Sequence, residues 1–329
     1  MTDVLVLGGT GWLSGRIAER WADGGASVTC LARGERPAPY GTTLALGDRD
    51  GPDAYDAVAS RDWDEVVDIS SNPVHVAAAV ETLGERAKHW TYISTVSAYA
   101  VNDEPGADES ADLVIPAGPD EDEDYGQAKV KAEASVRSSL GFRAAVVRPG
   151  LIVGPGDPTD RFGYWVSRFA LAADAPVLLP ETDGRGAQVI DVDDLAEFIQ
   201  SIGRERWTGA VNAVGDPIEL AAVFSEARDA AGYTGTAVTA GDDWLEEHEV
   251  AYWSGRRSLP LWLPRDMPGF WTRSNTAYRL LGGKLRPLGE TLRRTLADER
   301  ERGLARDRRA GLSRADEIAL LSELGVHNS

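Results

Sequence analysis

The sequence predicts an α/β protein with a doubly wound parallel sheet and a smaller, mostly helical C-terminal lobe. The first observation is a strand, a glycine turn, a helix and a second strand in direct succession at residues 4–7, 8–11, 12–23 and 27–31. The second is that apolar strand segments keep alternating with helical segments as far as residue 214. This alternation is typical of a parallel sheet with right-handed crossovers.

The remaining elements follow from short apolar runs, which predict strands, and from apolar residues at helical spacing, which predict helices. Pro73 fits a first helical turn because its missing N–H is not needed there. Further strands are expected at 43–46, 65–69, 90–93, 144–147, 188–190 and 210–214. Further helices are expected at 53–60, 73–88, from about 124, and at 191–202, 288–302 and 314–324.

The glycine turn Gly8-Gly9-Thr10-Gly11 is typical of a Rossmann-type dinucleotide-binding domain. Free N–H groups and the dipole at the start of the following helix favour a bound pyrophosphate. The third glycine of the usual pattern is replaced by Ser14, so we expect a slightly displaced helix and an intact site. The alternative interpretation is an ordinary strand-to-helix turn.

The end of the second strand indicates which dinucleotide would bind. An NAD site usually has a carboxylate there, whereas this chain has Arg33, which is placed to pair with a 2′-phosphate. The prediction is therefore NADP, with NAD less favoured, and the alternative is an exposed basic turn. Asp48, after the third strand, could accept from the adenine amino group or could lie in a solvated turn.

Composition limits the partners. The net charge of −19 over 329 residues disfavours nucleic acid and anionic membrane surfaces, which leaves a small-molecule substrate as the expected partner. The single Cys30 and four scattered histidines predict neither a disulfide nor a metal site. The chain enters a strand at once and has no long apolar run, so a cytoplasmic location is expected.

Two units are expected, an NAD(P)-binding domain at 1–156 plus 188–215 and a substrate-binding lobe at 157–187 plus 216–329. Four tryptophans crowd into residues 244–271 of the lobe. They could form its core or line the substrate pocket, and core is the expectation.

Tyr125 and Lys129 lie one helical turn apart and so share a helix face. At an effective dielectric of about 20, an ammonium about 4 Å away is worth about 4 kcal/mol, so Lys129 is expected to favour the phenolate of Tyr125. The acidic residues of 102–124 act against this, but they are solvated and screened. Thr95 follows the strand 90–93 at the sheet edge where α/β proteins bind ligands.

Several motifs together resemble the extended short-chain dehydrogenase/reductase family, in its NAD(P)-dependent epimerase/dehydratase branch. They are Gly8-Gly9-Thr10-Gly11, Ser94-Thr95-x-x-x-Tyr99, Tyr125-x-x-x-Lys129, the segment 148–155 and the segment 189–196. The resemblance implies an enzyme in which Tyr125 is the acid/base, Lys129 binds the nicotinamide ribose, and Thr95, or else Ser94 or Ser97, orients the substrate. The cofactor contacts expected on this basis are Gly8, Thr10, Gly11, Trp12, Leu13, Arg33, Asp48, Ser70, Lys129 and Pro149. A homodimer is also implied.

Two departures weaken a sugar-nucleotide substrate. Leu151 stands where such family members commonly have Asn, and Val96-Ser97 stands where the 4,6-dehydratases have Asp-Glu. The leading interpretation is an NADP(H)-dependent reductase or dehydrogenase that moves hydride between nicotinamide and a carbonyl or alcohol of a small, partly apolar molecule. The alternatives are an epimerase or isomerase with retained NAD(P) that acts by transient oxidation, and a non-catalytic NADP- or RNA-binding homologue.

Overall fold

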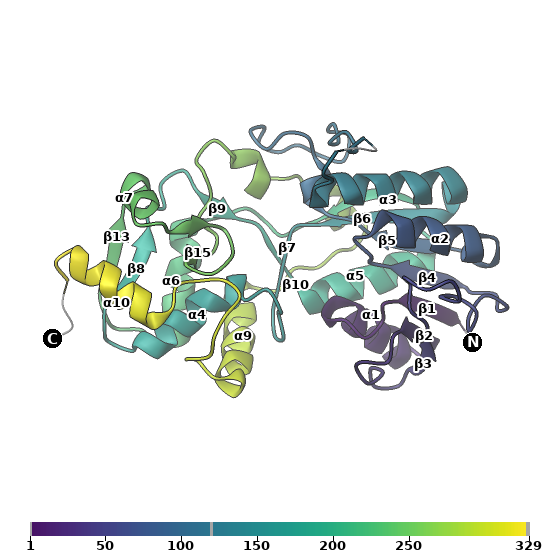
Figure 1. The fold of residues 1–329 in the computed structure, drawn as a ribbon, viewed down its shortest axis with the longest axis horizontal. Coiled ribbons are helices and arrows are strands. Elements are labelled where there is room, and N and C mark those ends of the chain that lie inside the picture. Colours follow the sequence, from purple (N-terminus) through teal and green to yellow (C-terminus); the bar gives the residue numbers. More distant parts are fainter. Residues whose placement is uncertain (1, 119–120, 327–329) are drawn as a thin grey trace.

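A single seven-stranded sheet forms the N-terminal part of the protein in the computed structural model, which describes residues 2–118 and 121–326 (Figure 1). The strand order is β11-β6-β5-β4-β1-β2-β3, and every neighbouring pair is parallel. The strands are β1 (Asp3–Leu7), β2 (Ser27–Ala32), β3 (Thr43–Leu46), β4 (Glu65–Asp68), β5 (Trp90–Ile93), β6 (Ala144–Pro149) and β11 (Gly209–Ala213). The order reverses between β1 and β4, and this reversal confirms the predicted doubly wound sheet.

Helices cover both faces of the sheet (Figure 1). Alternate residues of β1 point to opposite faces, since Val4 and Val6 pack on one side and Leu5 and Leu7 on the other. The first face carries α1 (Trp12–Asp23) and α5 (Val192–Glu205), and the second carries α2 (Pro73–Leu83) and α3 (Tyr125–Leu140). A parallel sheet buried in this way explains the continuous apolar runs of its strands.

The predicted helix at 53–60 is wrong, because the structure has a series of turns there. Its conformation is set by long-range contacts: the Tyr55 hydroxyl donates to the carbonyl of His75 at 2.9 Å, and Ala54 and Val58 fill the sheet core. The predicted helix at 73–88 is also too long. It ends at Leu83 and continues only as a short 3-10 turn, Gly84–Arg86.

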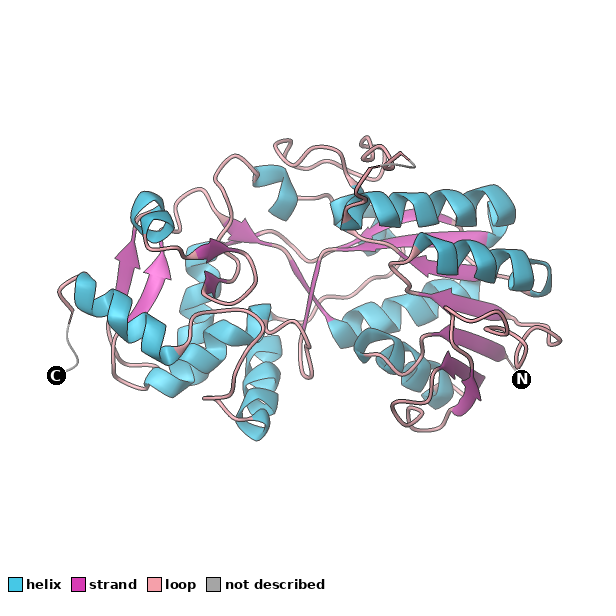
Figure 2. Cartoon of the chain, in the orientation of Figure 1, coloured by secondary structure: helices cyan, strands magenta, loops and turns pink. Residues whose placement is uncertain are grey.

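The C-terminal lobe is mostly helical and has its own apolar core (Figure 2). Trp165, Phe169, Phe224 and Trp262 lie in this core, and Trp165 and Phe224 have ring centroids 4.3 Å apart. The lobe contains α4 (Arg161–Ala172), α6 (Leu220–Ala231), α7 (Asp242–Glu247), α9 (Leu288–Arg302), α10 (Arg314–Glu323), and a two-stranded sheet of β8 (Val177–Pro180) and β13 (Ala237–Ala240).

Two crossing strands, β7 (Leu151–Val153) and β10 (Val189–Asp191), run between the sheet and the lobe as a parallel pair (Figure 2). The short helix α8 (Thr276–Leu280), from the C-terminal part of the chain, packs against the sheet domain. Its Tyr278 contacts Phe198 of α5, with ring centroids 4.4 Å apart, in the core on that face of the sheet. The other short elements are β9 (Gly186–Ala187), β12 (Ile218–Glu219), β14 (Ala251–Tyr252), β15 (Ser258–Leu259) and 3-10 turns at Val96–Ala98, Gly141–Arg143 and Pro268–Trp271. None of the described helices is both long and apolar enough to cross a lipid bilayer.

A buried ion pair fixes α3 on the sheet. Glu133 of α3 is 1% exposed and Arg148 of β6 is 2% exposed. The Arg148 Nε and Nη2 atoms donate to the Glu133 carboxylate at 3.0 and 2.8 Å, and its Nη1 donates to the Tyr99 hydroxyl at 3.0 Å. Burial alone would raise the pKa of Glu133, but Arg148 holds it below its usual value. The pair therefore sets the position of the helix that begins with Tyr125.

Substituting Glu133→Gln should lower the free energy of unfolding by about 3 kcal/mol, because Arg148 would keep a buried charge without its counter-ion. Urea denaturation followed by tryptophan fluorescence measures this difference. The matched control is Glu81→Gln on the exposed face of α2, which should change the value by less than about 0.5 kcal/mol. Equal small effects of the two substitutions would contradict the role given to the ion pair.

Candidate active site

The glycine turn between β1 and α1 requires glycine for two separate reasons. Gly8 has φ +74°, a conformation that residues with a Cβ rarely adopt. A Cβ on Gly9 would lie 2.6 Å from the Cys30 Sγ atom of the next strand. The turn therefore passes close to β2 and delivers the chain into α1 at the carboxyl edge of the sheet.

Ser14 replaces the usual third glycine and closes this turn with its side chain. Its hydroxyl donates to the Gly8 carbonyl at 2.6 Å and accepts from the Gly11 N–H at 3.0 Å. The hydrogen bonds found in the described chain leave the backbone N–H groups of Trp12 and Leu13 without a protein acceptor. These two groups, at the positive end of the α1 dipole, could hold an anionic group.

A cavity of about 410 Å³ lies beside the turn, at the ends of β1, β2 and β3. Arg33 and Arg36 both line it, and Arg33 Nη2 lies 3.1 Å from the Glu35 carboxylate in a largely exposed pair. Asp48 also lines this cavity, so the structure brings the residues predicted for the adenosine end together. Its lining comprises Gly8, Thr10, Gly11, Leu31, Ala32, Arg33, Glu35, Arg36, Gly47, Asp48, Arg49, Asp50 and His75.

A second cavity, of about 580 Å³, contains the residues predicted for catalysis. Thr95, Tyr125 and Lys129 all line it, together with Ser94 and Ser97. Trp12, Leu13 and Pro149 line it as well, so consecutive residues, Gly11 at the end of the turn and Trp12 at the start of α1, line the two cavities. Ser70, in contrast, is not among the lining residues: its carbonyl accepts from the Lys129 Nζ at 3.0 Å, and its neighbours Ile69 and Ser71 line the cavity.

Tyr125 is placed by the cap of α3. The Asp124 carboxylate accepts from the Gln127 N–H at 2.8 Å, and the Gln127 side chain accepts from the Asp124 N–H at 2.9 Å. As the first residue of the helix, Tyr125 opens to the cavity and is 53% exposed. Burial raises the pKa of its hydroxyl even so, and Thr95, Arg161 and Ser71 only partly offset this. The phenol is therefore protonated at neutral pH in the protein alone.

The expected effect of Lys129 on Tyr125 is corrected by the structure. Lys129 is 2% exposed, and its Nζ donates to the carbonyls of Ile69, Ser70 and Ile93 at 3.2, 3.0 and 2.6 Å. All three ammonium protons point to the ends of β4 and β5, and the pKa of Tyr125 is raised rather than lowered. Burial in turn lowers the pKa of Lys129 to about 8.

Sequence reasoning missed Arg161, which lines the same cavity. Arg161 is the cation that lowers the pKa of Tyr125 in the structure. It follows Pro158-Thr159-Asp160 and begins α4. A cation at the positive end of a helix dipole is unfavourable, but no helix was predicted at residues 161–172, so this signal became visible only in the structure.

The tryptophans of residues 244–271 divide between two roles. Trp262 is buried in the lobe core, as expected. Trp253 instead lines the second cavity, and with Trp271 it lines a smaller apolar pocket beside it. Trp253 has φ +64°, a strained conformation for an aromatic residue.

The stability of the protein should rise with pH through the titration of Lys129. Below about pH 8 both the folded and the unfolded state carry its proton. Above about pH 8 the folded state loses this proton, whereas the unfolded state keeps it, because the pKa of Lys129 in the unfolded chain is near 10.4. The free energy of unfolding should therefore increase by about 2 kcal/mol between about pH 7.5 and 9.5. Urea denaturation at the two pH values measures this.

The Lys129→Met variant should lack this part of the rise, whereas Lys284→Met, at a site 81% exposed, should keep it. If the Lys129→Met variant kept the pH profile of the wild type, the pKa of Lys129 would have to be the same in the folded and the unfolded protein.

Comparisons with known proteins agree with the fold. The sequence model of the NAD dependent epimerase/dehydratase family matches residues 4–212. No curated protein matches the chain. Among solved structures, a proposed epimerase from Burkholderia cenocepacia J2315 is 21% identical with a TM-score of 0.70, over 91% of this chain and 98% of that one.

Two further solved structures have similar coverage. The UDP-glucose 4-epimerase of Thermotoga maritima, solved with UDP-glucose, is 16% identical with a TM-score of 0.67, over 92% of this chain and 99% of that one. The UDP-glucose 4-epimerase of Thermus thermophilus, solved with NAD, is 17% identical with a TM-score of 0.64, over 91% of this chain and 99% of that one. At these identities the likeness is one of fold.

Proposed function

Because the chain belongs to the NAD-dependent epimerase/dehydratase family, whose members are enzymes, we propose that it is an epimerase acting on an alcohol carbon by transient oxidation. The observation that carries the proposal is the cavity that Thr95, Tyr125 and Lys129 line together with the first residues of α1. Its volume of about 580 Å³ is within the range of small-molecule sites. This choice revises the preference for a net reductase, since the family and the 4-epimerases of like fold support the alternative better.

The residues present fit a nicotinamide dinucleotide. The unpaired N–H groups of Trp12 and Leu13 would hold the pyrophosphate, and the cavity at Arg33 would take the adenosine end. Pro149 lines the cavity that would take the nicotinamide. When bound, the oxidised nicotinamide supplies a hydride acceptor and a positive charge that favours the phenolate of Tyr125.

Each side chain then has a separate role. Tyr125 takes the proton of the substrate hydroxyl and returns it to the oxygen, while Thr95 donates a hydrogen bond to the same oxygen. Lys129 fixes the ends of β4 and β5 beside the tyrosine through its three carbonyl contacts. Contact of Lys129 with the nicotinamide ribose would require one of these bonds to be exchanged.

The Tyr125→Phe variant should lose at least about 100-fold in kcat and keep its affinity for the cofactor, because only the proton transfer is removed. The test is epimerisation of a panel of sugar nucleotides and hydroxy acids, followed by NMR, with cofactor binding measured separately. The wild type should convert a substrate with no net consumption of nicotinamide. Unchanged turnover in Tyr125→Phe would refute the assignment of the acid/base.

A net NADP(H)-dependent reductase is the second candidate, and Arg33 and Arg36 at the adenosine cavity favour it. We propose NADP as the preferred cofactor on the same observation, since a guanidinium can pair with the 2′-phosphate. Stoichiometric loss of NADPH with a carbonyl substrate would identify the reductase. Retained cofactor and isomerised product would identify the epimerase.

The Arg33→Ala variant should weaken NADPH binding at least about tenfold and leave NADH binding almost unchanged, because only NADPH carries the 2′-phosphate. Fluorescence titration with each nucleotide measures both affinities. The control is Arg86→Ala, an exposed arginine paired with Asp62 outside the cavity. Equal losses for NADPH and NADH in Arg33→Ala would reverse the cofactor preference.

We further propose two units, at 1–156 plus 188–215 and at 157–187 plus 216–329. The proposed protein is a cytoplasmic homodimer that acts on a small, partly apolar substrate. The aromatic wall formed by Trp253 and Phe270 supports a partly apolar substrate.

A further inference from the structure

Arg161 presents two terminal guanidinium nitrogens to the substrate cavity, and no acceptor among the described residues binds them. Its Nε donates to the Thr159 hydroxyl at 3.3 Å. Among the described residues, no carboxylate forms an ion pair with its guanidinium. Lys129 is the other lysine or arginine that lines this cavity, and its three donors are bound to carbonyls.

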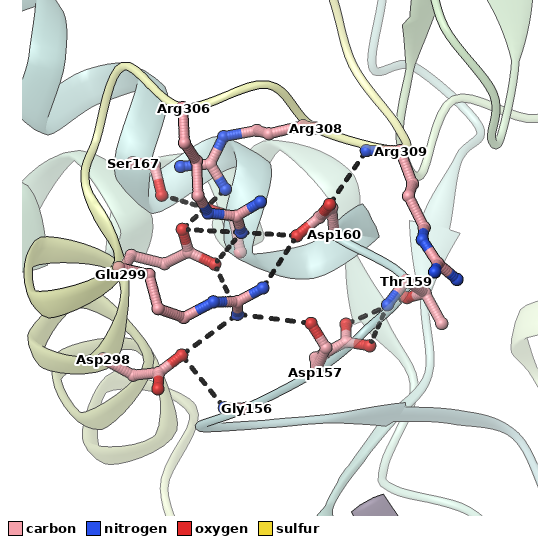
Figure 3. A network of polar contacts seen from close by, with 12 residues as sticks. Gly156, Asp157, Thr159, Asp160, Ser167, Asp298, Glu299, Arg306, Arg308 and Arg309 are labelled. Atoms are coloured by element: carbon pink, nitrogen blue, oxygen red, sulfur yellow. Dashed lines mark hydrogen bonds and ion pairs between the residues drawn. The ribbon is translucent and has the colours of Figure 1, made fainter. Parts of the chain in front are cut away.

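The carboxylates next to Arg161 are held by other groups. Asp160 has φ +63°, and its carboxylate is bound by Arg306 and by the Arg309 N–H, which donates to it at 2.8 Å (Figure 3). Asp157 accepts from the N–H and the hydroxyl of Thr159 at 2.8 and 3.0 Å. The network around Asp160 thus leaves Arg161 facing the cavity without a partner of opposite charge.

This placement is unfavourable in the protein alone. Burial lowers the pKa of Arg161, and Asp157 and Tyr125 only partly offset the effect. The positive end of the α4 dipole adds to the penalty, since Arg161 is the first residue of that helix. A bound anion beside the guanidinium would relieve both effects.

An aromatic wall stands next to the guanidinium. The Arg161 Cζ lies 4.9 Å from the centroid of the Trp253 ring, and Phe270 meets Trp253 edge to face at 5.3 Å and 89°. The backbone N–H of Trp253 donates to the Trp262 carbonyl at 3.1 Å, which holds the strained residue in place. Trp253 and Phe270 also line the small apolar pocket beside the cavity.

We propose that the site takes a hydroxy or oxo acid whose single carboxylate is bound by Arg161 and whose apolar, preferably aromatic, body packs on Trp253 and Phe270. The proposal rests on the proposed function, because it assigns the substrate class of the same site. A planar guanidinium with two free nitrogens matches a carboxylate in a bidentate pair. A nucleoside diphosphate carries more negative charge than the one available cation in this cavity can balance.

The test is the affinity of the purified protein, saturated with NADP⁺, for matched ligand pairs. The pairs are mandelate with mandelamide, and 3-hydroxy-3-phenylpropanoate with its amide, and UDP-glucose is the competing ligand. Isothermal titration calorimetry gives each Kd. At least one acid should bind about tenfold or more tightly than its amide, because a charge-assisted pair replaces a neutral contact.

The arginine is then tested directly. Arg161→Gln should abolish the preference for the acid, Arg161→Lys should keep part of it, and Arg300→Gln, exposed on α9, should leave it unchanged. Circular dichroism and Tm establish that each variant is folded. If Arg161→Gln does not fold, the preference of Arg161→Lys for acid over amide is the test of the arginine. Equal binding of acids and amides, or tighter binding of UDP-glucose that does not depend on Arg161, would overturn the proposal.

Binding also separates this inference from the proposed function. A preference for acids that depends on Arg161, together with net consumption of NADPH, supports the inference and rejects the epimerase. Epimerisation of a neutral sugar without any preference for acids supports the epimerase and rejects the inference.

Discussion

The buried ammonium of Lys129 is the interaction on which the candidate site depends. It joins the carbonyl ends of β4 and β5 to α3, the helix that begins with Tyr125. A charge so enclosed is tolerated only because each proton has an acceptor and because Asp68 and Glu133 lie nearby. The ion pair of Glu133 with Arg148 of β6 fixes the same helix on the sheet. Two buried cations, Lys129 and Arg148, therefore position Tyr125 without contacting its hydroxyl.

The lobe contributes the Arg161 guanidinium to the cavity, and its terminal nitrogens have no acceptor among the described residues, unlike the ammonium of Lys129. Asp160 and Glu299 form ion pairs with Arg302 and Arg306, and these pairs join the loop after β7 to α9 and the segment that follows it (Figure 3). Arg161 follows Asp160 in sequence and contacts this network through its Nε, which donates to the Thr159 hydroxyl at 3.3 Å. The result is a guanidinium without an ion-pair partner among the described residues, beside the aromatic side chains of Trp253 and Phe270, within a protein of net charge −19.

Local sequence patterns were enough to predict the sheet and most of its helices. The helix bounds of 12–23 and 288–302 match the structure, because apolar periodicity and the glycine and proline residues at their ends are local signals. The segment 53–60 failed because distant contacts of Tyr55 decide its conformation. The spacing of Tyr125 and Lys129 placed both in one cavity, but it could not reveal the carbonyls that capture the ammonium. Arg161 was missed for a similar reason, since its neighbours become evident only when the lobe is folded.

Ser14 has a consequence for how a ligand would meet the glycine turn. A turn built from glycines is ordinarily mobile, and binding must then restrict it, with a loss of conformational entropy. Here one hydroxyl bonded to Gly8 and Gly11 restricts the loop during folding itself. The serine that departs from the usual pattern thus makes the turn preorganised, and less of the free energy of association is spent on ordering the backbone.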